Sequence, residues 1–258
     1  MAVESLYFGS SSAPVFGVYH PAHPDTDRYE GAVLCYPFGQ DYMRAHRSFR
    51  LLAASLTRKG YHVLRMDYRG TGDSAGDLEE YLPADWAEDI SMAVGELRDS
   101  AGIQRVGLLG LRLGALLAAE VAAGRDDITF LVAWDPLISG DVYLRELRDE
   151  IALIPQDFRH DKQIDERGYL HFNGFAMTPG FQRNLQQFDM STISPQASRI
   201  LQVVSHETDD FARLRGAWSE LPGYQYRHVP APYNWNYVDY VGGIMLPLPI
   251  LTAIVDWL

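Results

Sequence analysis

The stretch QRVGLLGLRLGALLAA, residues 104–119, constrains the fold of this chain more than any other. It opens with a short apolar run, Val106 to Leu109, typical of a strand buried on both faces of a parallel sheet. Gly110 and Gly114 then bracket a turn, and the alanine-rich segment from Ala115 to Ala123 suits a helix packed closely on that sheet. The order of strand, tight turn and helix predicts an α/β fold that presents the central residue of the turn at the sheet edge.

Strands and helices alternate on both sides of this stretch. Leu6–Phe8 and Val15–Tyr19 predict an antiparallel hairpin at a sheet edge. The alternation after it predicts a mostly parallel, doubly wound sheet with right-handed crossovers. The predicted strands are Gly31–Tyr36, Tyr61–Met66, Ile128–Trp134, Ile200–Ser205 and Gln225–Val229, and the predicted helices run from about Ala45 to Lys59, Ala84 to Arg98, Asp210 to Leu221 and Pro249 to Leu258.

Charge and composition exclude several classes of function. A formal net charge of −12 over 258 residues argues against nucleic acid or an anionic membrane surface as the main partner, although an anionic small molecule is still allowed. The one cysteine, Cys35, is expected to be a buried thiol and makes an internal disulfide impossible. No spacing of His, Cys or carboxylates indicates a metal site, and we expect no cofactor.

The ends of the chain predict a cytoplasmic protein. The first residues, MAVESLYF, lack the basic and long apolar regions of a signal peptide. Val241–Val255 is the one apolar stretch to weigh as a membrane segment, but it is short and carries Pro247 and Pro249. We therefore expect a helix that docks on the core and no membrane span. The sequence leaves open whether the protein is a monomer or a homodimer.

Four motifs resemble the α/β-hydrolase superfamily, and more closely its serine-less type 2 hydrolases of the exosortase A system. The motifs are GLRLGALLA at 110–118, MDYRGTGDS at 66–74, LVAWDPLISG at 131–140 and PYNWN at 232–236. The resemblance implies the α/β-hydrolase fold. It also implies that the break in the alternation holds a lid, which divides the chain into a core, 1–136 and 191–258, and an insertion, 137–190. Asn173-Gly174 predicts a hairpin inside that insertion.

Arg112 stands where the superfamily pattern G-x-S-x-G has its nucleophilic serine. A guanidinium stays protonated and offers only hydrogen-bond donors, so it cannot act as the nucleophile. It can clamp a carboxylate or phosphate with two hydrogen bonds, assisted by the N-terminus of the following helix. The alternative is that Arg112 pairs with a neighbouring acid such as Asp135 and fills a pocket that binds no ligand.

The end of the predicted strand Gly31–Tyr36 resembles the oxyanion-hole loop of the superfamily. The backbone N–H groups of Phe38 and Leu113 are the two candidate donors, and an ordinary tight turn is the alternative. We expect substrate contacts from Phe38 and Leu113, from Tyr36, Gly39 and Gln40 in the same region, and from Trp235.

The remaining members of a hydrolase triad are only partly represented. Asp209 is the best positional match for the acid, with an N-cap of the next helix as its alternative. The loop that should carry the histidine reads PAPYNWN, with Trp235 or Asn236 in its place, and His228 falls inside a strand. His206, at a strand end, is either a general base or a structural residue, and Asp135 could take the acid role.

The sequence therefore supports two functions. In the first, Arg112 and the Phe38 and Leu113 amides stabilise negative charge on an acyl or carboxylate-bearing small molecule. His206 or a carboxylate then moves a proton, and hydrolysis by water, elimination and cyclisation all fit. In the second, the protein is a non-catalytic binding or partner protein. An open polar cavity with His206 facing Arg112 favours the first, and a cavity filled by Trp235 and lid aromatics favours the second.

Overall fold

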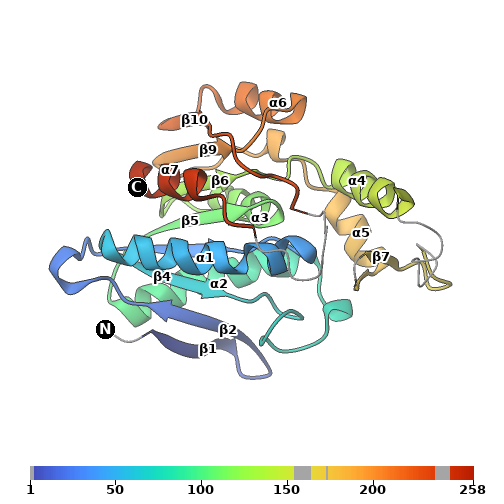
Figure 1. The fold of residues 1–258 in the computed structure, drawn as a ribbon. Coiled ribbons are helices and arrows are strands. Elements are labelled where there is room, and N and C mark those ends of the chain that lie inside the picture. The colour runs from blue at the N-terminus through green and yellow to red at the C-terminus, as the bar shows by residue number, and fades with distance from the viewer. Residues whose placement is uncertain (1–2, 154–163, 173, 236–244) are drawn as a thin grey trace.

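The computed structural model describes residues 3–153, 164–172, 174–235 and 245–258, which form an eight-stranded sheet covered by helices (Figure 1). The strand order is β1-β2-β4-β3-β5-β6-β9-β10. The strands are β1 (Glu4–Ser10), β2 (Ala13–His20), β3 (Glu30–Cys35), β4 (Tyr61–Met66), β5 (Arg105–Leu111), β6 (Ile128–Trp134), β9 (Arg199–Val204) and β10 (Tyr224–His228). The helices are α1 (Gln40–Arg58), α2 (Pro83–Ala101), α3 (Leu113–Ala123), α4 (Gly140–Leu153), α5 (Pro179–Gln186), α6 (Asp209–Trp218) and α7 (Leu248–Trp257).

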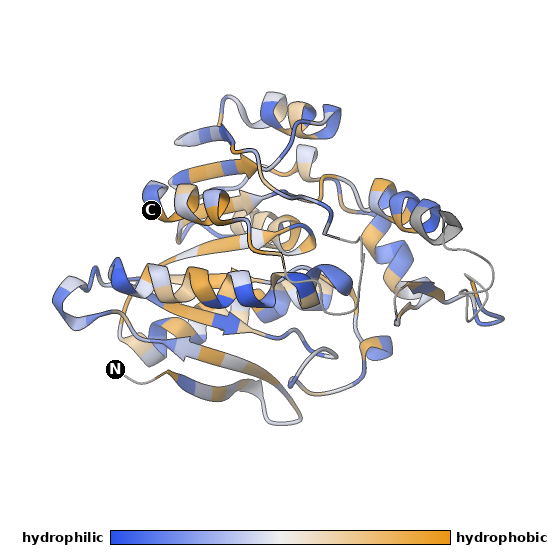
Figure 2. Ribbon diagram, in the orientation of Figure 1, coloured by the Kyte–Doolittle hydropathy of each residue, from blue (hydrophilic) through white to orange (hydrophobic). Residues whose placement is uncertain are grey.

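The predicted mostly parallel, doubly wound sheet is confirmed. β1 and β2 form the antiparallel hairpin at one edge, β2 pairs antiparallel with β4, and all pairs from β4 to β10 are parallel. Every residue of β3 and β4 is buried, because helices cover both faces of the sheet there. Figure 2 shows this burial: the central strands are hydrophobic, and the helices that cover the sheet have hydrophilic outer faces.

Helix ends show the main differences from the sequence-based expectation. α1 begins at Gln40, five residues before the predicted start at Ala45, because Gly39 caps it with a φ of 64°. The chain therefore passes from the end of β3 into α1 through a single short turn. This early start places Asp41 in the first turn of α1, buried against the sheet edge.

The described residues between β6 and β9 lie together at one end of the sheet (Figure 1). α4, α5 and a small antiparallel hairpin of β7 (Leu170–Phe172) and β8 (Phe175–Met177) make up this region. The hairpin turns at Gly174 as predicted, whereas Asn173 lies outside the described residues. The boundaries of a lid at 137–190 stay a prediction.

The C-terminal helix α7 packs on the core, with Ile250, Leu251 and Ile254 buried. It lies beside α1 on one face of the sheet (Figure 1). Part of the apolar stretch Val241–Val255, residues 241–244, lies outside the described residues. Of the helices that the structure does describe, none has the length and apolar character needed to cross a membrane.

The two glycines of the central turn are required by close backbone contacts. A Cβ on Gly110 would collide with the backbone of Gly114 and Ala115, and a Cβ on Gly114 would collide with the carbonyl oxygens of Cys35 and Tyr36. Only glycine lets the start of α3 pass this close to β5 and to the end of β3.

We expect Gly114→Ala to lower the free energy of unfolding by about 1–3 kcal/mol or more, because the added methyl forces the backbone apart. Gly95→Ala is the matched control. Gly95 lies inside α2 with nothing within 4 Å of its added Cβ, so alanine should stabilise the protein by about 0.5–1 kcal/mol. Urea unfolding of both variants measures the effect. Equal midpoints for Gly114→Ala and wild type would contradict the requirement for glycine.

Candidate active site

Arg112 lies on the tight turn between β5 and α3, as predicted. Its backbone has φ 54° and ψ −120°, a conformation that non-glycine residues rarely adopt and that costs about 1–3 kcal/mol. The turn is held from both sides, since the Arg112 N–H donates to the Trp134 carbonyl and the Arg112 carbonyl accepts from the Leu137 N–H, each at 3.1 Å. The turn is thereby bound to the end of β6 and the first residues of the following segment.

The Arg112 side chain points toward acidic and aromatic groups from α1 and α4. Its Nε lies 3.4 Å from Oδ2 of Asp41, and its Nη2 lies 3.7 Å from Oε2 of Glu146. The guanidinium also lies over the ring of Tyr143, 5.6 Å from its centroid. The sequence-based alternative named Asp135 as its partner, but among the described side chains Asp41 and Glu146 make these ion pairs.

Asp41 is a site residue that sequence reasoning missed. It is 1% exposed, and its Oδ1 has no hydrogen-bond partner among the described residues. Burial raises the pKa of the Asp41 carboxyl to about 6, against the opposing effect of Arg112. The one signal in the sequence is an acidic residue two positions after Gly39, in the break that follows the strand Gly31–Tyr36.

Asp135 is buried at the end of β6 and holds a well-satisfied carboxylate. It accepts from the Ser205 N–H at 2.6 Å, from the Ser205 hydroxyl at 2.7 Å and from the Trp235 indole N–H at 3.2 Å. Its own backbone has φ 38°. Trp235 is buried edge-on against Trp134, and Asn236 lies outside the described residues.

His206 follows Ser205 and makes contacts on several sides. Its Nδ1 lies 3.2 Å from the Ser205 hydroxyl oxygen, and its ring stacks on Tyr233 with centroids 3.9 Å apart. Partial burial lowers the pKa of His206 below its ordinary value; the Arg112 charge also lowers it, and Asp135 opposes the shift. The imidazole is therefore neutral at pH 7.

A cavity of about 270 Å³ brings several of these residues together. Arg112, His206 and Asp209 line it, and Glu146 lines it from α4. Asp209 is exposed in the first turn of α6, and the cap of that helix is Thr208, whose hydroxyl accepts from the Phe211 N–H at 3.1 Å. The N-cap alternative for Asp209 was therefore wrong by one residue.

The loop after β3 borders a second cavity of about 290 Å³. Tyr36, Phe38 and Gly39 line it, together with aromatic residues that sequence reasoning missed, Tyr42, Tyr68, Trp86 and Phe175. Gln40 and Leu113 are the first residues of α1 and α3. Within the described residues, the backbone N–H groups of Phe38 and Leu113 donate to no acceptor.

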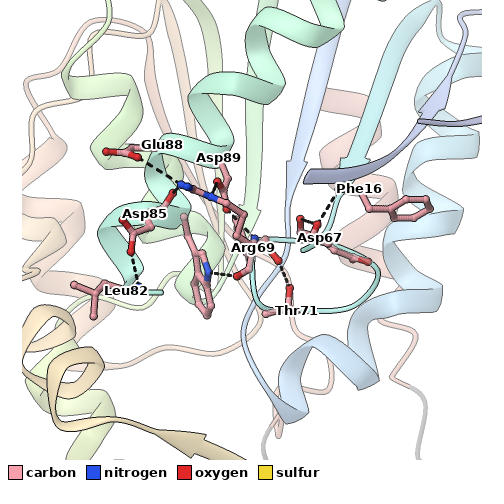
Figure 3. Close-up of polar contacts among 11 residues, drawn as sticks. Phe16, Asp67, Arg69, Thr71, Leu82, Asp85, Glu88 and Asp89 are labelled. Carbon is pink, nitrogen blue, oxygen red and sulfur yellow. Dashed lines mark hydrogen bonds and ion pairs between the residues drawn. The ribbon is translucent and has the colours of Figure 1, made fainter. Parts of the chain in front are cut away.

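The motif MDYRGTGDS forms one wall of this second cavity, and its arginine is engaged away from it (Figure 3). Arg69 donates to Asp89 of α2 through its backbone N–H at 2.9 Å and its Nε at 2.5 Å. Its carbonyl accepts from the Trp86 indole N–H at 2.9 Å, which holds that ring at the cavity. Arg69 therefore orders the loop that follows β4.

The other candidates lie outside the two cavities. Burial raises the pKa of the Cys35 thiol, which is fully buried within β3. His228 ends β10 with Nδ1 3.5 Å from Glu207. No cluster of three or more His, Cys, Asp or Glu that could hold a metal ion occurs in the described part of the chain.

Comparisons with known proteins place this geometry in a family. The model of the serine aminopeptidase (S33) family matches residues 42–197. An acyl transferase of Photobacterium phosphoreum is 26% identical over 160 residues, which make up 59% of this chain and 50% of that protein. An uncharacterized 31.7 kDa protein from the traX-finO intergenic region of Escherichia coli is 32% identical over 92 residues, 35% of this chain and 32% of that protein. The chain thus matches half or less of the length of these relatives.

Solved structures share the fold over nearly the full length. Est1E from Butyrivibrio proteoclasticus, solved with ferulic acid, has a TM-score of 0.70 at 14% identity and covers 98% of this chain and 97% of its own. The esterase Pf2001 of Pyrococcus furiosus has a TM-score of 0.69 at 15% identity, covering 99% and 89%. The narrower resemblance to the exosortase A system stays a prediction. The predicted α/β-hydrolase fold is confirmed, and the chain belongs to the serine aminopeptidase (S33) family of hydrolases.

Proposed function

We propose that this protein is an enzyme that acts on an acyl, ester or carboxylate-bearing small molecule without forming a covalent serine intermediate. One observation carries the proposal: Arg112, at the turn where the family has its nucleophile, and His206 line the same cavity. No hydroxyl or thiol side chain occurs between Gly110 and Gly114.

Three kinds of group share the proposed chemistry: a cation, two backbone amides and a base. The Arg112 guanidinium is charged at every physiological pH and attracts a carboxylate or a developing oxyanion. The N–H groups of Phe38 and Leu113, which have no acceptor among the described residues, are the further donors that we propose for this charge. His206, neutral at pH 7, accepts a proton from water or from the substrate. Hydrolysis by water, elimination and cyclisation all use these groups.

The second cavity supports a ligand with an aromatic or apolar acyl portion. Its lining is mostly aromatic, and the rings of Phe38 and Phe175 meet there at 5.5 Å. Ferulic acid, the ligand of Est1E, joins an aromatic ring to a carboxylate. Residues 137–190 would act as a lid, since they supply Phe175 to this cavity and Glu146 to the cavity at Arg112.

The alternative function is a non-catalytic binding protein. Its support is that side chains of the site already bind one another. Trp235 belongs to the loop predicted to carry the histidine, and its indole N–H donates to Asp135. Arg112 faces two acids. Those ion-pair distances, 3.4 and 3.7 Å, are long beside the 2.7–2.9 Å of a strong charged hydrogen bond. Arg112 therefore keeps the capacity to bind an anion, which favours the first function.

Ferulate and related aromatic carboxylates serve as probes for the role of Arg112. We expect Arg112→Ala to weaken binding about tenfold to a hundredfold, the equivalent of a charged hydrogen bond worth about 1.5–3 kcal/mol. Arg112→Lys should recover part of the loss because it keeps the charge without the planar fork. Isothermal titration calorimetry measures both.

Arg145→Ala is the matched control for net charge, since Arg145 is an exposed arginine on α4 that pairs with Asp141. It should bind the probe as wild type does. Unchanged affinity in Arg112→Ala, for a carboxylate that the wild type binds, would mean that Arg112 has a structural role only. The non-catalytic binding protein would then be the better supported function.

A serine-directed fluorophosphonate should leave residues 110–114 unlabelled, because no nucleophilic side chain lies on the turn. Intact-mass and peptide mass spectrometry detect any adduct, with a serine esterase treated in parallel as the positive control. Stoichiometric labelling of this segment would contradict a mechanism without a covalent serine.

The free energy of unfolding should depend on pH because the pKa of Asp41 is raised. Its folded-state pKa of about 6 lies above the ordinary value of 3.8, so the folded protein holds this proton more tightly than the unfolded chain. The resulting stability is complete below about pH 4 and is lost as pH rises through 6. Each pKa unit corresponds to about 1.4 kcal/mol, so the loss reaches about 3 kcal/mol.

We therefore expect Asp41→Asn, which cannot ionise, to match wild type near pH 4 and to exceed it increasingly toward pH 7. Urea unfolding at a series of pH values measures the difference. A difference that does not change with pH would show that Asp41 ionises normally.

A further inference from the structure

Three polar side chains at the edge of the cavity form a continuous hydrogen-bonded chain. The Ser205 hydroxyl oxygen lies 2.7 Å from Oδ2 of Asp135 and 3.2 Å from Nδ1 of His206. Asp135 and Ser205 are 1% and 3% exposed, so water does not compete for these bonds. The direction of each bond can therefore be worked out from the number of protons available.

The Ser205 hydroxyl has one proton, and it is donated to Asp135. The Asp135 carboxylate receives two further donors, the Ser205 N–H on Oδ1 and the Trp235 indole N–H on Oδ2. An ionised carboxylate only accepts hydrogen bonds. The Ser205 oxygen then faces His206 with a lone pair, so the contact with Nδ1 is a hydrogen bond only if Nδ1 carries the proton.

A neutral imidazole has a single N–H, so a proton on Nδ1 leaves the lone pair on Nε2. Nε2 has no hydrogen-bond partner among the described residues. The ring is held by stacking on Tyr233 and by the edge of Phe211, 5.3 Å away. His206 lines the same cavity as Arg112, where a substrate would meet it.

We propose that Asp135 and Ser205 are positioning residues that hold His206 as the Nδ1–H tautomer and so present Nε2 as the base of this site. The role of Nε2 as a base depends on the proposed function, whereas the tautomer does not. Trp235 is part of this arrangement, because its indole N–H can only donate and it donates to Oδ2 of Asp135, the same oxygen that accepts from the Ser205 hydroxyl.

The proton transfer that this arrangement permits is simple. Nε2 takes the proton of a water O–H or of an acidic bond in the substrate, and the electron pair of that bond stays on the atom that loses the proton. The imidazole becomes an imidazolium whose Nδ1–H still donates to Ser205. Its charge then faces the buried Asp135 carboxylate through a single hydroxyl, while Arg112 and His228 oppose it and Glu146 favours it.

Nitrogen-15 NMR of the histidine side chains tests the proposal without any ligand. His206→Gln assigns the signals. At pH 8 we expect the wild type to show His206 mainly as the Nδ1–H tautomer, and Ser205→Ala to lose this preference because Nδ1 then has no acceptor. The Nε2–H tautomer in the wild type would overturn the proposal.

Asp135→Ala provides a second arm that does not remove the serine. It takes away the acceptor of the Ser205 hydroxyl, so the serine proton is free to turn toward Nδ1 of His206. His206 should then lose its preference for the Nδ1–H tautomer. Backbone amide spectra confirm that each variant is folded, and an unchanged Nδ1–H preference in folded Asp135→Ala would contradict the proposed positioning by Asp135.

The outcomes separate this inference from the proposed function. A wild-type Nδ1–H tautomer with no effect of Arg112→Ala on probe binding would support the positioning of His206 by Asp135 and Ser205 and contradict the anion site at Arg112. An Nε2–H tautomer together with a loss of binding in Arg112→Ala would contradict the positioning of His206 and support the anion site.

Discussion

The close approach of α3 to the loop after β3 is the constraint on which the rest of this site depends. It exists because neither Gly110 nor Gly114 has a Cβ, and the backbone between them turns through a conformation that Arg112 adopts at a cost. The same turn binds the end of β6 through hydrogen bonds on both sides of Arg112. One local geometry thus fixes how Arg112, the end of β3 and the end of β6 lie relative to one another.

Hydrogen bonding distinguishes two equally buried carboxylates that lie close to this turn. Asp135 receives three hydrogen bonds, whereas Asp41 has one long contact with Arg112 and an oxygen without a partner among the described residues. Burial raises the pKa of the Asp41 carboxyl to about 6. Asp135 is suited to orient a neighbouring side chain, and Asp41 is suited to take up a proton near neutral pH.

The two cavities differ in polarity. The cavity at Arg112 and His206 carries charged groups from α4 and α6, while the cavity behind Phe38 is walled by aromatic rings. Arg69 pairs with the buried carboxylate of Asp89 and so holds the wall of the second cavity, although neither residue lines that cavity. The arginine of the motif MDYRGTGDS therefore has an architectural role in the loop after β4.

Local sequence signals are enough to predict the mostly parallel sheet, the turn after β5 and the residue at the centre of that turn. Continuous apolar runs and closely placed glycines are such signals, and they predict Tyr61–Met66 and Ile128–Trp134 with the bounds that the strands have. The partners of the buried polar side chains follow from the three-dimensional packing. Arg112 meets Asp41 across 71 positions, and Ser205 meets Asp135 across 70. Neither pair has a sequence signal, because a side chain's partner depends on which strand ends adjoin and where a helix begins, and α1 begins earlier than its apolar periodicity indicates.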